Sequence, residues 1–279
     1  MTDLLDRLIN AWLWVATVLV VLLGLPAVTL VFLVTAPFDP GRYYAGRAFR
    51  LIAVVHTAVN PYWHFRLSGQ VHLADPRRPY VVVSNHESYA DVFLISHLPW
   101  EMKWLAKRTI FKIPVMGWMM RMAGDVPVDR GSRRSAVVAL ARCRDRLRKR
   151  VSVMIFPEGT RSRDGGLLPF RDGAFRLAVE TQLPVLPLVV AGTRDMMAKG
   201  TFRFRPAHAD VRVLDAVPTA GLREEDVPAL RERVRAIIDA ARRELARERG
   251  EPEPPRLAAD LAPHPEPSAA VESATPLPG

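Results

Sequence analysis

The chain has 279 residues and one cysteine, and its 39 Lys and Arg outnumber its 29 Asp and Glu, for a formal net charge of +10. A chain of this length buries a substantial core, which excludes a disulfide-stapled miniprotein and a wholly disordered chain. A single cysteine also excludes an intramolecular disulfide and a thiolate metal cluster. The positive charge fits three kinds of anionic partner: nucleic acid, an acidic membrane surface or a phosphorylated small substrate.

The N-terminal segment is a long apolar run. No charged residue lies between Arg7 and Asp39, and this run exceeds the roughly 20 helical residues that cross a bilayer core. Gly24 and Pro26 lie near its middle, so a kinked membrane-spanning helix, which we favour, competes with a re-entrant helical hairpin. A cleaved signal peptide fits less well, because the apolar run of a signal peptide is only about 7–15 residues long and the run in this chain is longer. We therefore expect residues 1–41 to form a membrane segment.

The residues after this run are basic and then amphipathic. Arg42, Arg47 and Arg50 follow closely, and positive flanks tend to stay in the cytoplasm, so the rest of the chain is expected on the cytoplasmic side of the cell membrane. Residues 43–59 fit either a helix at the lipid interface or the first helix of the folded domain. We assign residues 42–249 to that domain.

The middle of the chain alternates strand and helix patterns. Helices are predicted at residues 133–150 and 227–249, where apolar residues recur at helical spacing. Cys143 lies on the apolar stripe of the first of these and is interpreted as a core residue. The alternation predicts an α/β fold with a central mixed sheet flanked by helices, preceded by the N-terminal membrane helix. The predicted strands are residues 64–67, 80–84, 151–156, 185–190, 202–204 and 211–216.

A polar cluster containing His86 and Asp91 follows the strand at residues 80–84. On one continuous helix these two side chains would point about 140° apart, so they meet only if His86 lies in the turn before a helix and Asp91 in its first turns. The carboxylate then orients the imidazole and leaves one ring nitrogen as a general base. A capping histidine and a two-ligand metal site are the alternatives. Ser88 lacks the context of a hydrolase nucleophile and is interpreted as a cap.

A second polar cluster follows the strand at residues 151–156. Gly159 permits a turn geometry that other residues disfavour, and Arg161 is able to grip a phosphate with two parallel hydrogen bonds. A surface turn with a solvated arginine is the alternative. The full block reads Phe156-Pro157-Glu158-Gly159-Thr160-Arg161-Ser162.

Together, this block and the earlier block, in which four residues separate His86 from Asp91, resemble the glycerolipid acyltransferase family typified by 1-acylglycerol-3-phosphate acyltransferase. Two weaker blocks, residues 124–130 and 183–189, occur in the order that the family shows. The resemblance covers roughly residues 60–220.

The resemblance implies transfer of a fatty acyl group from a thioester of coenzyme A or acyl carrier protein to the free hydroxyl of 1-acylglycerol-3-phosphate, giving phosphatidic acid. It implies that His86 is the base and that Asp91 orients it, with no metal and no cofactor beyond the thioester substrate. The alternatives are an acyltransferase for another lysophospholipid or glycolipid acceptor and a non-catalytic lipid-binding membrane tether. The acceptor and phosphate site implied by the resemblance comprises Arg130, Glu158, Gly159, Thr160 and Arg161.

The sequence departs from the family pattern in two places. Asp125 and Pro127 stand where the second block commonly carries apolar residues, which bears on the local strand and on the phosphate role of Arg130. Glu87 replaces the glutamine often found after the histidine, and a carboxylate there can raise the pKa of His86.

Residues 100–122 interleave tryptophans and methionines with Lys103, Lys107, Arg108 and Lys112. The mixture fits an acyl-chain groove at the bilayer surface with its basic heads toward phosphate, and it also fits a packed helix with solvated lysines. Lys107 is the best candidate of this segment for acceptor binding.

The remaining charge is unevenly placed. Residues 130–150 carry nine bases against the single acid Asp145, which fits acidic lipid headgroups or the phosphates of coenzyme A. No nucleic-acid motif accompanies these bases, so nucleic acid is not an expected partner.

Residues 250–279 contain eight prolines and five acids and predict a disordered acidic tail. Without that tail, 38 bases face 24 acids, a balance of +14.

Overall fold

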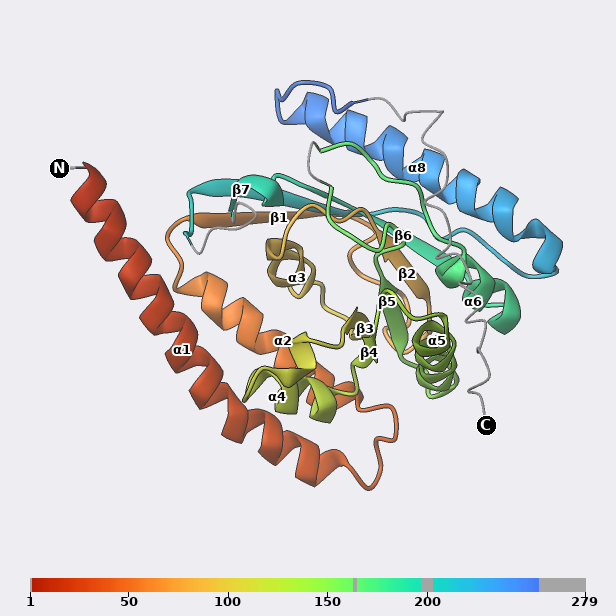
Figure 1. Ribbon diagram of the computed structural model, residues 1–279, viewed down its shortest axis with the longest axis horizontal. Helices are drawn as coiled ribbons and strands as arrows, with labels where there is room; N and C mark the ends of the chain where they lie inside the picture. The colour runs from red at the N-terminus through yellow and green to blue at the C-terminus, as the bar shows by residue number, and fades with distance from the viewer. Residues whose placement is uncertain (1, 163–164, 197–202, 256–279) are drawn as a thin grey trace, which may run out of the picture.

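The computed structural model of the chain describes residues 2–162, 165–196 and 203–255 (Figure 1). Its centre is a seven-stranded sheet in the order β1-β7-β6-β2-β5-β3-β4. In the described sheet β6 and β7 pair antiparallel, whereas all other neighbours pair parallel. The mixed sheet predicted from the sequence is thus confirmed. The strands are β1 (Trp63–Gly69), β2 (Val81–Ser84), β3 (Met102–Lys107), β4 (Val126–Val128), β5 (Ser152–Ile155), β6 (Val185–Ala191) and β7 (Ala207–Val213).

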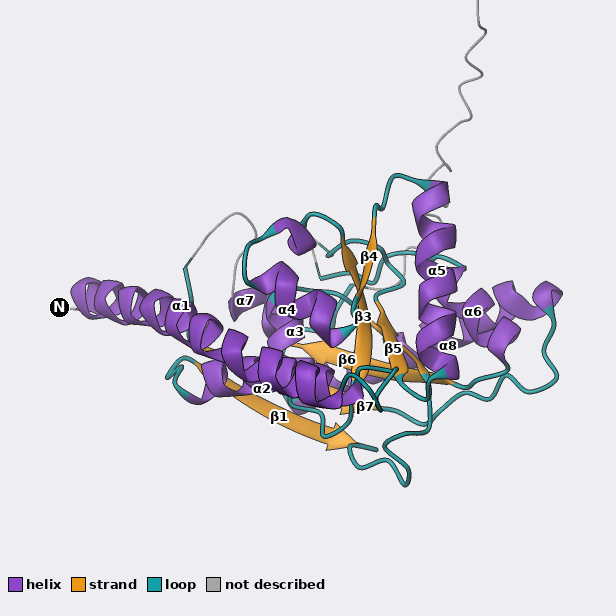
Figure 2. Ribbon diagram, turned by 90° about the horizontal axis from the view of Figure 1, so that it is seen from below, coloured by secondary structure: helices purple, strands orange, loops and turns teal. Residues whose placement is uncertain are grey.

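Helices cover both faces of the sheet (Figure 2). Because side chains alternate along a strand, Val81 and Val83 of β2 pack into the core beneath α5, α6 and α8, while Val82 packs into the core on the other face with α3. The helices are α1 (Thr2–Thr35), α2 (Tyr43–Ala58), α3 (Ala90–Ile95), α4 (Met116–Ala123), α5 (Arg133–Arg148), α6 (Gly173–Thr181), α7 (Thr193–Met196) and α8 (Val227–Glu248), with 3₁₀ turns at Ile110–Lys112 and Glu224–Asp226.

The N-terminal apolar run forms one continuous helix, α1. Within it, Leu4–Thr35 is long and apolar enough to cross a membrane. The re-entrant break considered at Gly24 and Pro26 does not occur. The chain turns only after α1, and α2 returns alongside it, as Figures 1 and 2 both show. Gly24 permits this close approach, because a Cβ atom there would lie 2.3 Å from Cδ1 of Ile52.

A third core joins α1, α2 and α4. Val28 of α1 and Met119 of α4 are fully buried in it, together with Phe49 of α2. The helix predicted at residues 43–59 therefore packs against the folded domain on one side and against the apolar helix on the other. The proposed division at residue 41 stays a prediction, and most of the predicted tail, residues 256–279, lies outside the described residues.

Most predicted elements are present, and the exceptions are instructive. β7 begins four residues earlier than the predicted strand at 211–216. The predicted strand at 202–204 is wrong for its described part, since Phe204 lies outside any strand. The strands β3 and β4 were missed, because β3 lacks β-branched residues and β4 is short and contains Pro127. β4 tolerates this proline because it is an edge strand.

Candidate active site

The predicted site residues gather at one edge of the sheet. Strands β6, β2, β5, β3 and β4 are adjacent and parallel, so their carboxyl ends meet there. His86 follows β2, Glu158 follows β5 and Arg130 follows β4, while Lys107 is the last residue of β3. The strand order thus brings together blocks that lie far apart in the sequence.

His86 and Asp91 form the hydrogen-bonded pair that their spacing predicts. His86 lies in the turn before α3 and Asp91 in its first turn, and Nδ1 of His86 is 2.7 Å from Oδ2 of Asp91. Asp91 is fully buried, and its Oδ2 also accepts the backbone N–H groups of Glu87 and Ser88. Nε2 of His86 has no hydrogen-bond partner in the described part of the chain, and 8% of the side chain is exposed. The pair therefore has the geometry of a general base with its orienting carboxylate.

The block after β5 holds His86 from two sides. The ring of His86 stacks on Phe156, with centroids 4.0 Å apart and an interplanar angle of 16°. The backbone N–H of Ser162 donates to the carbonyl of His86 over 3.0 Å. The imidazole orientation thus depends on both turns, the one after β2 and the one after β5, rather than on α3 alone.

Glu158 connects these two turns. Its Oε1 accepts the backbone N–H of His86 at 2.7 Å, and its Oε2 accepts that of Leu168 at 2.9 Å. Burial raises the pKa of Glu158 to about 8, although both N–H groups oppose that rise. Because both carboxylate oxygens are engaged with the backbone, the geometry fits the shaping role implied for Glu158 rather than a direct contact with phosphate.

A cavity of about 140 Å³ lies beside Phe156 and is lined by Arg130, Gly159 and Arg171. Arg171 was missed, because it lies outside the recognised block. Gly159 has φ of +68°, and a Cβ atom there would lie 2.8 Å from Nε of Arg171, so the guanidinium packs directly on the turn. The other lining residues are mainly apolar and include Leu105, Val128, Leu140 and Ile155.

Arg130, Arg161 and Arg171 concentrate positive charge at this edge. Burial lowers the pKa of Arg130, and the positive charges of Arg171 and Arg161 lower it further. Arg161 lies over the ring of Tyr89, 3.9 Å from its centroid. Within the described residues, none of the three arginines forms an ion pair with a carboxylate. Three guanidinium groups of this kind favour an anionic ligand.

Thr160 and Lys107 are both exposed at this edge, and neither lines the cavity. Lys107 pairs in the ladder with Val128, two residues before Arg130. Their implied roles in acceptor binding stay predictions.

The other basic residues of the 100–122 segment do not form the expected row of headgroup-facing cations. Lys103 is fully buried, 2.9 Å from Oε1 of Glu101, and it also donates to the carbonyl of Arg42. Arg108 pairs with Asp129 at 2.6 Å. The expectation for Lys103 is wrong, because the alternation of β3 turns this side chain into the interior.

Asp125 has a structural partner. It is bonded to Arg50 of α2, and its Oδ1 also accepts the backbone N–H of Trp104 at 3.0 Å. The acid that breaks the family's second block therefore ties α2 to the sheet, and β4 forms and leads to Arg130 as in the predicted site.

Two further polar residues near the pair were not assigned by sequence reasoning. Thr193 donates its hydroxyl to Oδ1 of Asp91, and its Oγ1 lies 3.5 Å from Oε2 of Glu87. The signal was present, since Thr193 follows the strand at 185–190 just as His86 follows its strand.

Among the described residues, no group of three or more His, Cys, Asp and Glu side chains is placed to hold a metal. Cys143 is fully buried, as predicted, and burial raises the pKa of its thiol to about 12.

Known proteins are similar to this chain in sequence and in fold. Residues 64–191 match the family model described as Acyltransferase. A 1-acyl-sn-glycerol-3-phosphate acyltransferase named acl-2 and described as putative, from Caenorhabditis elegans, is 32% identical over 197 residues, which cover 70% of this chain and 67% of that protein. The chain belongs to the glycerolipid acyltransferase family.

Other proteins of this family are also similar to the chain. A chloroplastic 1-acyl-sn-glycerol-3-phosphate acyltransferase of Arabidopsis thaliana is 38% identical, with 74% of this chain and 56% of that protein covered. The human alpha form is 39% identical, covering 63% and 62%. This chain thus spans about half to three fifths of the length of these curated relatives. The crystal structure of the 1-acyl-sn-glycerophosphate acyltransferase PlsC of Thermotoga maritima superposes with a TM-score of 0.72 at 27% identity, covering 88% of this chain and 98% of that one.

Proposed function

We propose that this acyltransferase moves a fatty acyl group from an acyl thioester of coenzyme A or acyl carrier protein to the free hydroxyl of 1-acylglycerol-3-phosphate, producing phosphatidic acid. The observation that carries the proposal is the placement, on one edge of the sheet, of the His86–Asp91 pair and three arginines that have no ion pair among the described residues. The printed names of the relatives, which are acyltransferases of this acceptor, support it.

The chemistry follows from the free ring nitrogen. Nε2 of His86 accepts the proton of the acceptor hydroxyl as its oxygen attacks the thioester carbonyl carbon, and the carboxylate of Asp91 stabilises the resulting imidazolium. Collapse of the tetrahedral intermediate forms the ester, breaks the carbon–sulfur bond and expels the thiolate, which takes the proton from His86 and leaves as the thiol. No acyl-enzyme is needed, because a thioester is already activated and both substrates are held together.

The arginines supply recognition of the acceptor. Arg130 and Arg171 line the cavity, and Arg161 follows the same turn as Gly159, so a phosphate there would meet guanidinium groups. The acid among the described lining residues, Asp129, is paired with Arg108. Lys107 would add a point charge from the end of β3. Phe156 borders both this cavity and the ring of His86, so the proposed phosphate site and the base are neighbours.

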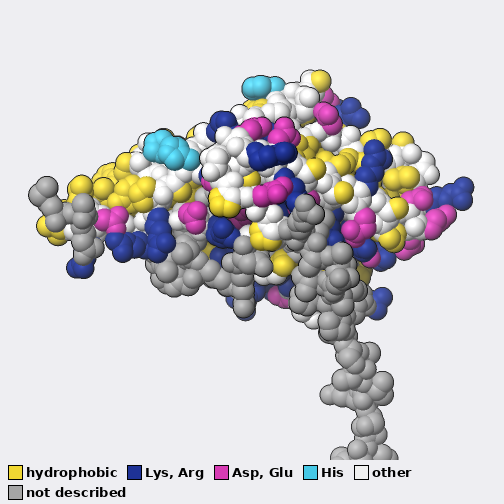
Figure 3. Space-filling model, turned by 90° about the horizontal axis from the view of Figure 1, so that it is seen from above, with side chains coloured by type: hydrophobic (Ala, Val, Ile, Leu, Met, Phe, Trp, Pro, Cys, Tyr) yellow, Lys and Arg dark blue, Asp and Glu magenta, His cyan; other side chains and the backbone are white. Residues whose placement is uncertain are grey.

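Membrane association follows from α1. The helix is long and apolar enough to cross a membrane, and only 6% of its most apolar stretch of residues is buried by the rest of the chain. Figure 3 shows hydrophobic side chains gathered at the end of the molecule where α1 begins. Trp118 of α4 and Ile113 are also exposed, at 53% and 51%. We propose that these surfaces contact the cell membrane, rich in acidic lipids, with the catalytic domain on its cytoplasmic side.

The test uses the purified full chain in detergent or lipid. Acyl-CoA and acyl carrier protein donors of several chain lengths are assayed against lysophosphatidic acid, a lysophospholipid with another headgroup, and monoacylglycerol. We expect the highest kcat/KM with lysophosphatidic acid. Absence of transfer to every acceptor from both donors would refute the enzymatic proposal, and preference for another acceptor would refute the substrate.

The phosphate site is tested by Arg171→Gln, with Arg150→Gln as the matched control, because Arg150 is exposed, pairs with Asp75 and precedes β5 at the opposite edge of the sheet. Losing a charge-assisted hydrogen bond should raise KM for lysophosphatidic acid roughly tenfold and leave turnover of monoacylglycerol unchanged. An equal effect on both acceptors would show that Arg171 does not bind the phosphate.

A further inference from the structure

The two oxygens of Asp91 have different partners. Oδ2 bonds the imidazole and two backbone N–H groups, all from the turn before α3 or its start. In the described part of the chain, Oδ1 has one partner, the hydroxyl of Thr193, which is 102 residues away in the sequence. The torsion of the carboxylate, and with it the direction of His86, therefore depends on a residue that follows another strand.

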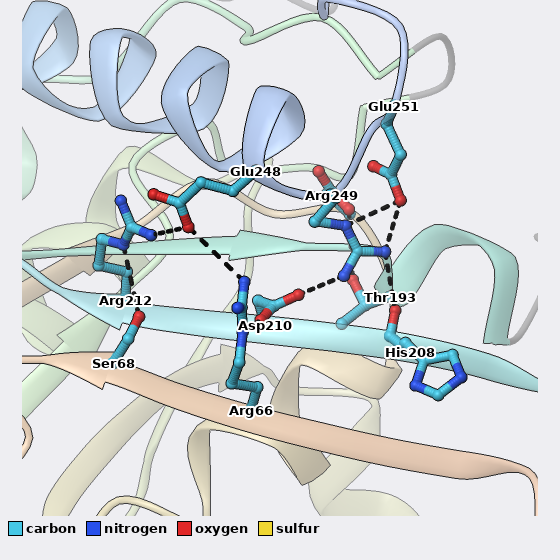
Figure 4. Close-up of polar contacts among 10 residues, drawn as sticks. Arg66, Ser68, Thr193, His208, Asp210, Arg212, Glu248, Arg249 and Glu251 are labelled. Carbon is cyan, nitrogen blue, oxygen red and sulfur yellow. Dashed lines mark hydrogen bonds and ion pairs between the residues drawn. The ribbon is translucent and has the colours of Figure 1, made fainter.

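The backbone fixes the position of Thr193. It is fully buried and follows Gly192, which has φ of +82° at the end of β6. A Cβ atom on Gly192 would lie 2.3 Å from the carbonyl oxygen of His208 and 2.5 Å from a guanidinium nitrogen of Arg249. Figure 4 shows this guanidinium anchored by Asp210 and Glu251 and donating to the His208 carbonyl. The turn that presents Thr193 is thus packed against β7 and the end of α8.

Glu87 touches the same hydroxyl. Thr193 has one hydroxyl proton, and the shorter contact assigns it to Asp91, so the 3.5 Å contact with Oε2 of Glu87 is a hydrogen bond only when Glu87 carries a proton and donates it. Burial, and after it the negative charge of Asp91, raise the pKa of Glu87 to about 7. Among the other charged groups that face it, Arg242 and Arg194 oppose the rise, and Glu251 reinforces it.

We propose that Thr193 is a positioning residue for Asp91 and that protonated Glu87 supports it, in a chain of hydrogen bonds from Glu87 through Thr193 and Asp91 to His86. The inference rests on the proposed function for its kinetic readouts. In this chain Glu87, when protonated, offers the same kind of donor as the glutamine that the family often has at this position.

The chain of bonds predicts a pH dependence. As the pH rises through about 7, Glu87 loses its proton and becomes a second anion competing for the Thr193 hydroxyl, so the hold on Asp91 weakens. The kcat of the wild type should therefore fall on the alkaline side. Glu87→Gln keeps an N–H donor but cannot titrate, so its kcat should stay high there.

The kinetic test compares Thr193→Val, which keeps the shape and removes the hydroxyl, with Thr193→Ser, which restores it. Thr193→Val should lower kcat about 10- to 100-fold, the effect of a lost hydrogen bond to a charged group, with KM for lysophosphatidic acid within about twofold. Thr193→Ser should recover kcat to within about threefold of the wild type. Thr181→Val is the matched control, because among the described residues the Thr181 hydroxyl bonds carbonyls of its own helix alone.

A readout without turnover separates this inference from the proposed function. The Nδ1 proton of His86, identified by its absence in His86→Ala, should shift by NMR in Thr193→Val and return in Thr193→Ser, whether or not lysophosphatidic acid is the acceptor. Circular dichroism confirms that each variant folds. An unshifted proton in a folded Thr193→Val, or equal kcat in the wild type and Thr193→Val, would overturn the positioning role. An alkaline fall that persists unchanged in Glu87→Gln would overturn the role of Glu87.

Discussion

Two buried polar clusters, one after β2 and β5 and the other among α2 and the starts of β3 and β4, differ in what they leave unsatisfied. In the active-site cluster, His86, Asp91 and Glu158 bond one another or the backbone, and a single basic nitrogen, Nε2 of His86, stays without a partner among the described residues. In the second cluster, Arg50 bonds Asp125 and Lys103 bonds Glu101.

The second cluster leaves no described group directed at a substrate. Its unpartnered atoms include Oε2 of Glu101 and Oδ2 of Asp125, and both are enclosed by protein. Gly46 of α2 lies directly on it, since a Cβ atom there would be 2.1 Å from Glu101 and 2.3 Å from Lys103. Buried charge by itself therefore does not identify a catalytic group. What distinguishes the candidate site is a buried network with one basic nitrogen that has no partner among the described residues. The comparison predicts that variants of one cluster affect activity and variants of the other affect stability.

The largest expected effect is that of His86→Ala. Removal of a general base lowers kcat about 10²- to 10⁴-fold. The melting temperature should also fall, because the side chain is buried against Phe156 and bonds Asp91, so kcat is compared for the folded fraction. Activity assays and thermal melts of the purified protein check this. Full acyl transfer by the variant would exclude His86 as the base, and a tether without catalysis would show no turnover in the wild type either.

Lys103→Met tests the other side of the comparison. It leaves Glu101 buried without its cation, which should destabilise the protein by about 3–5 kcal/mol. The kcat of the folded fraction should be close to that of the wild type. Lys112→Met, which removes an exposed lysine of the same segment, is the control and should not change denaturant midpoints. Unchanged stability of Lys103→Met would remove the distinction between the clusters.

Glu158→Gln sharpens the role of the connecting carboxylate. One amide N–H of the glutamine must face a backbone N–H, so either His86 or Leu168 loses its acceptor, at a cost of about 1–3 kcal/mol. We expect kcat to fall roughly tenfold, with KM for the acceptor less affected. Glu180→Gln on the exposed side of α6 should be neutral. A selective rise in KM would instead indicate that Glu158 binds the acceptor.

The smallest effect concerns stability and pH. The folded-state pKa of Glu87 is raised from 4.5 to about 7, so its neutral form is favoured and the charged form costs stability as the pH rises through that window. Glu87→Gln removes this cost. The stability of Glu87→Gln relative to the wild type should therefore increase between about pH 5 and pH 8. We expect an increase of about 1–2 kcal/mol, less than the full pKa shift would give, because water reaches the half-buried side chain. A difference that is independent of pH would contradict the raised pKa.

Local patterns predicted much of the fold and the core of the site. The parallel strands β2, β5 and β6 carry continuous apolar runs, so their positions were readable, as was the apolar stripe of α5 that contains Cys143. The pairing of His86 with Asp91 was also readable, since both belong to one turn. Lys103 was misjudged because its charge outweighed the alternation of a strand that local propensity did not reveal.

The sequence by itself determined the α/β class, the apolar first helix, the candidate catalytic pair and the family, because each is read from local patterns or from the order of short blocks along the chain. Only the tertiary structure decided which distant groups complete the site. Arg171 reaches the cavity across the Gly159 turn, and Thr193 reaches Asp91 from the end of β6. The strand order determines which of these residues lie close together, and no local pattern encodes which strands become neighbours.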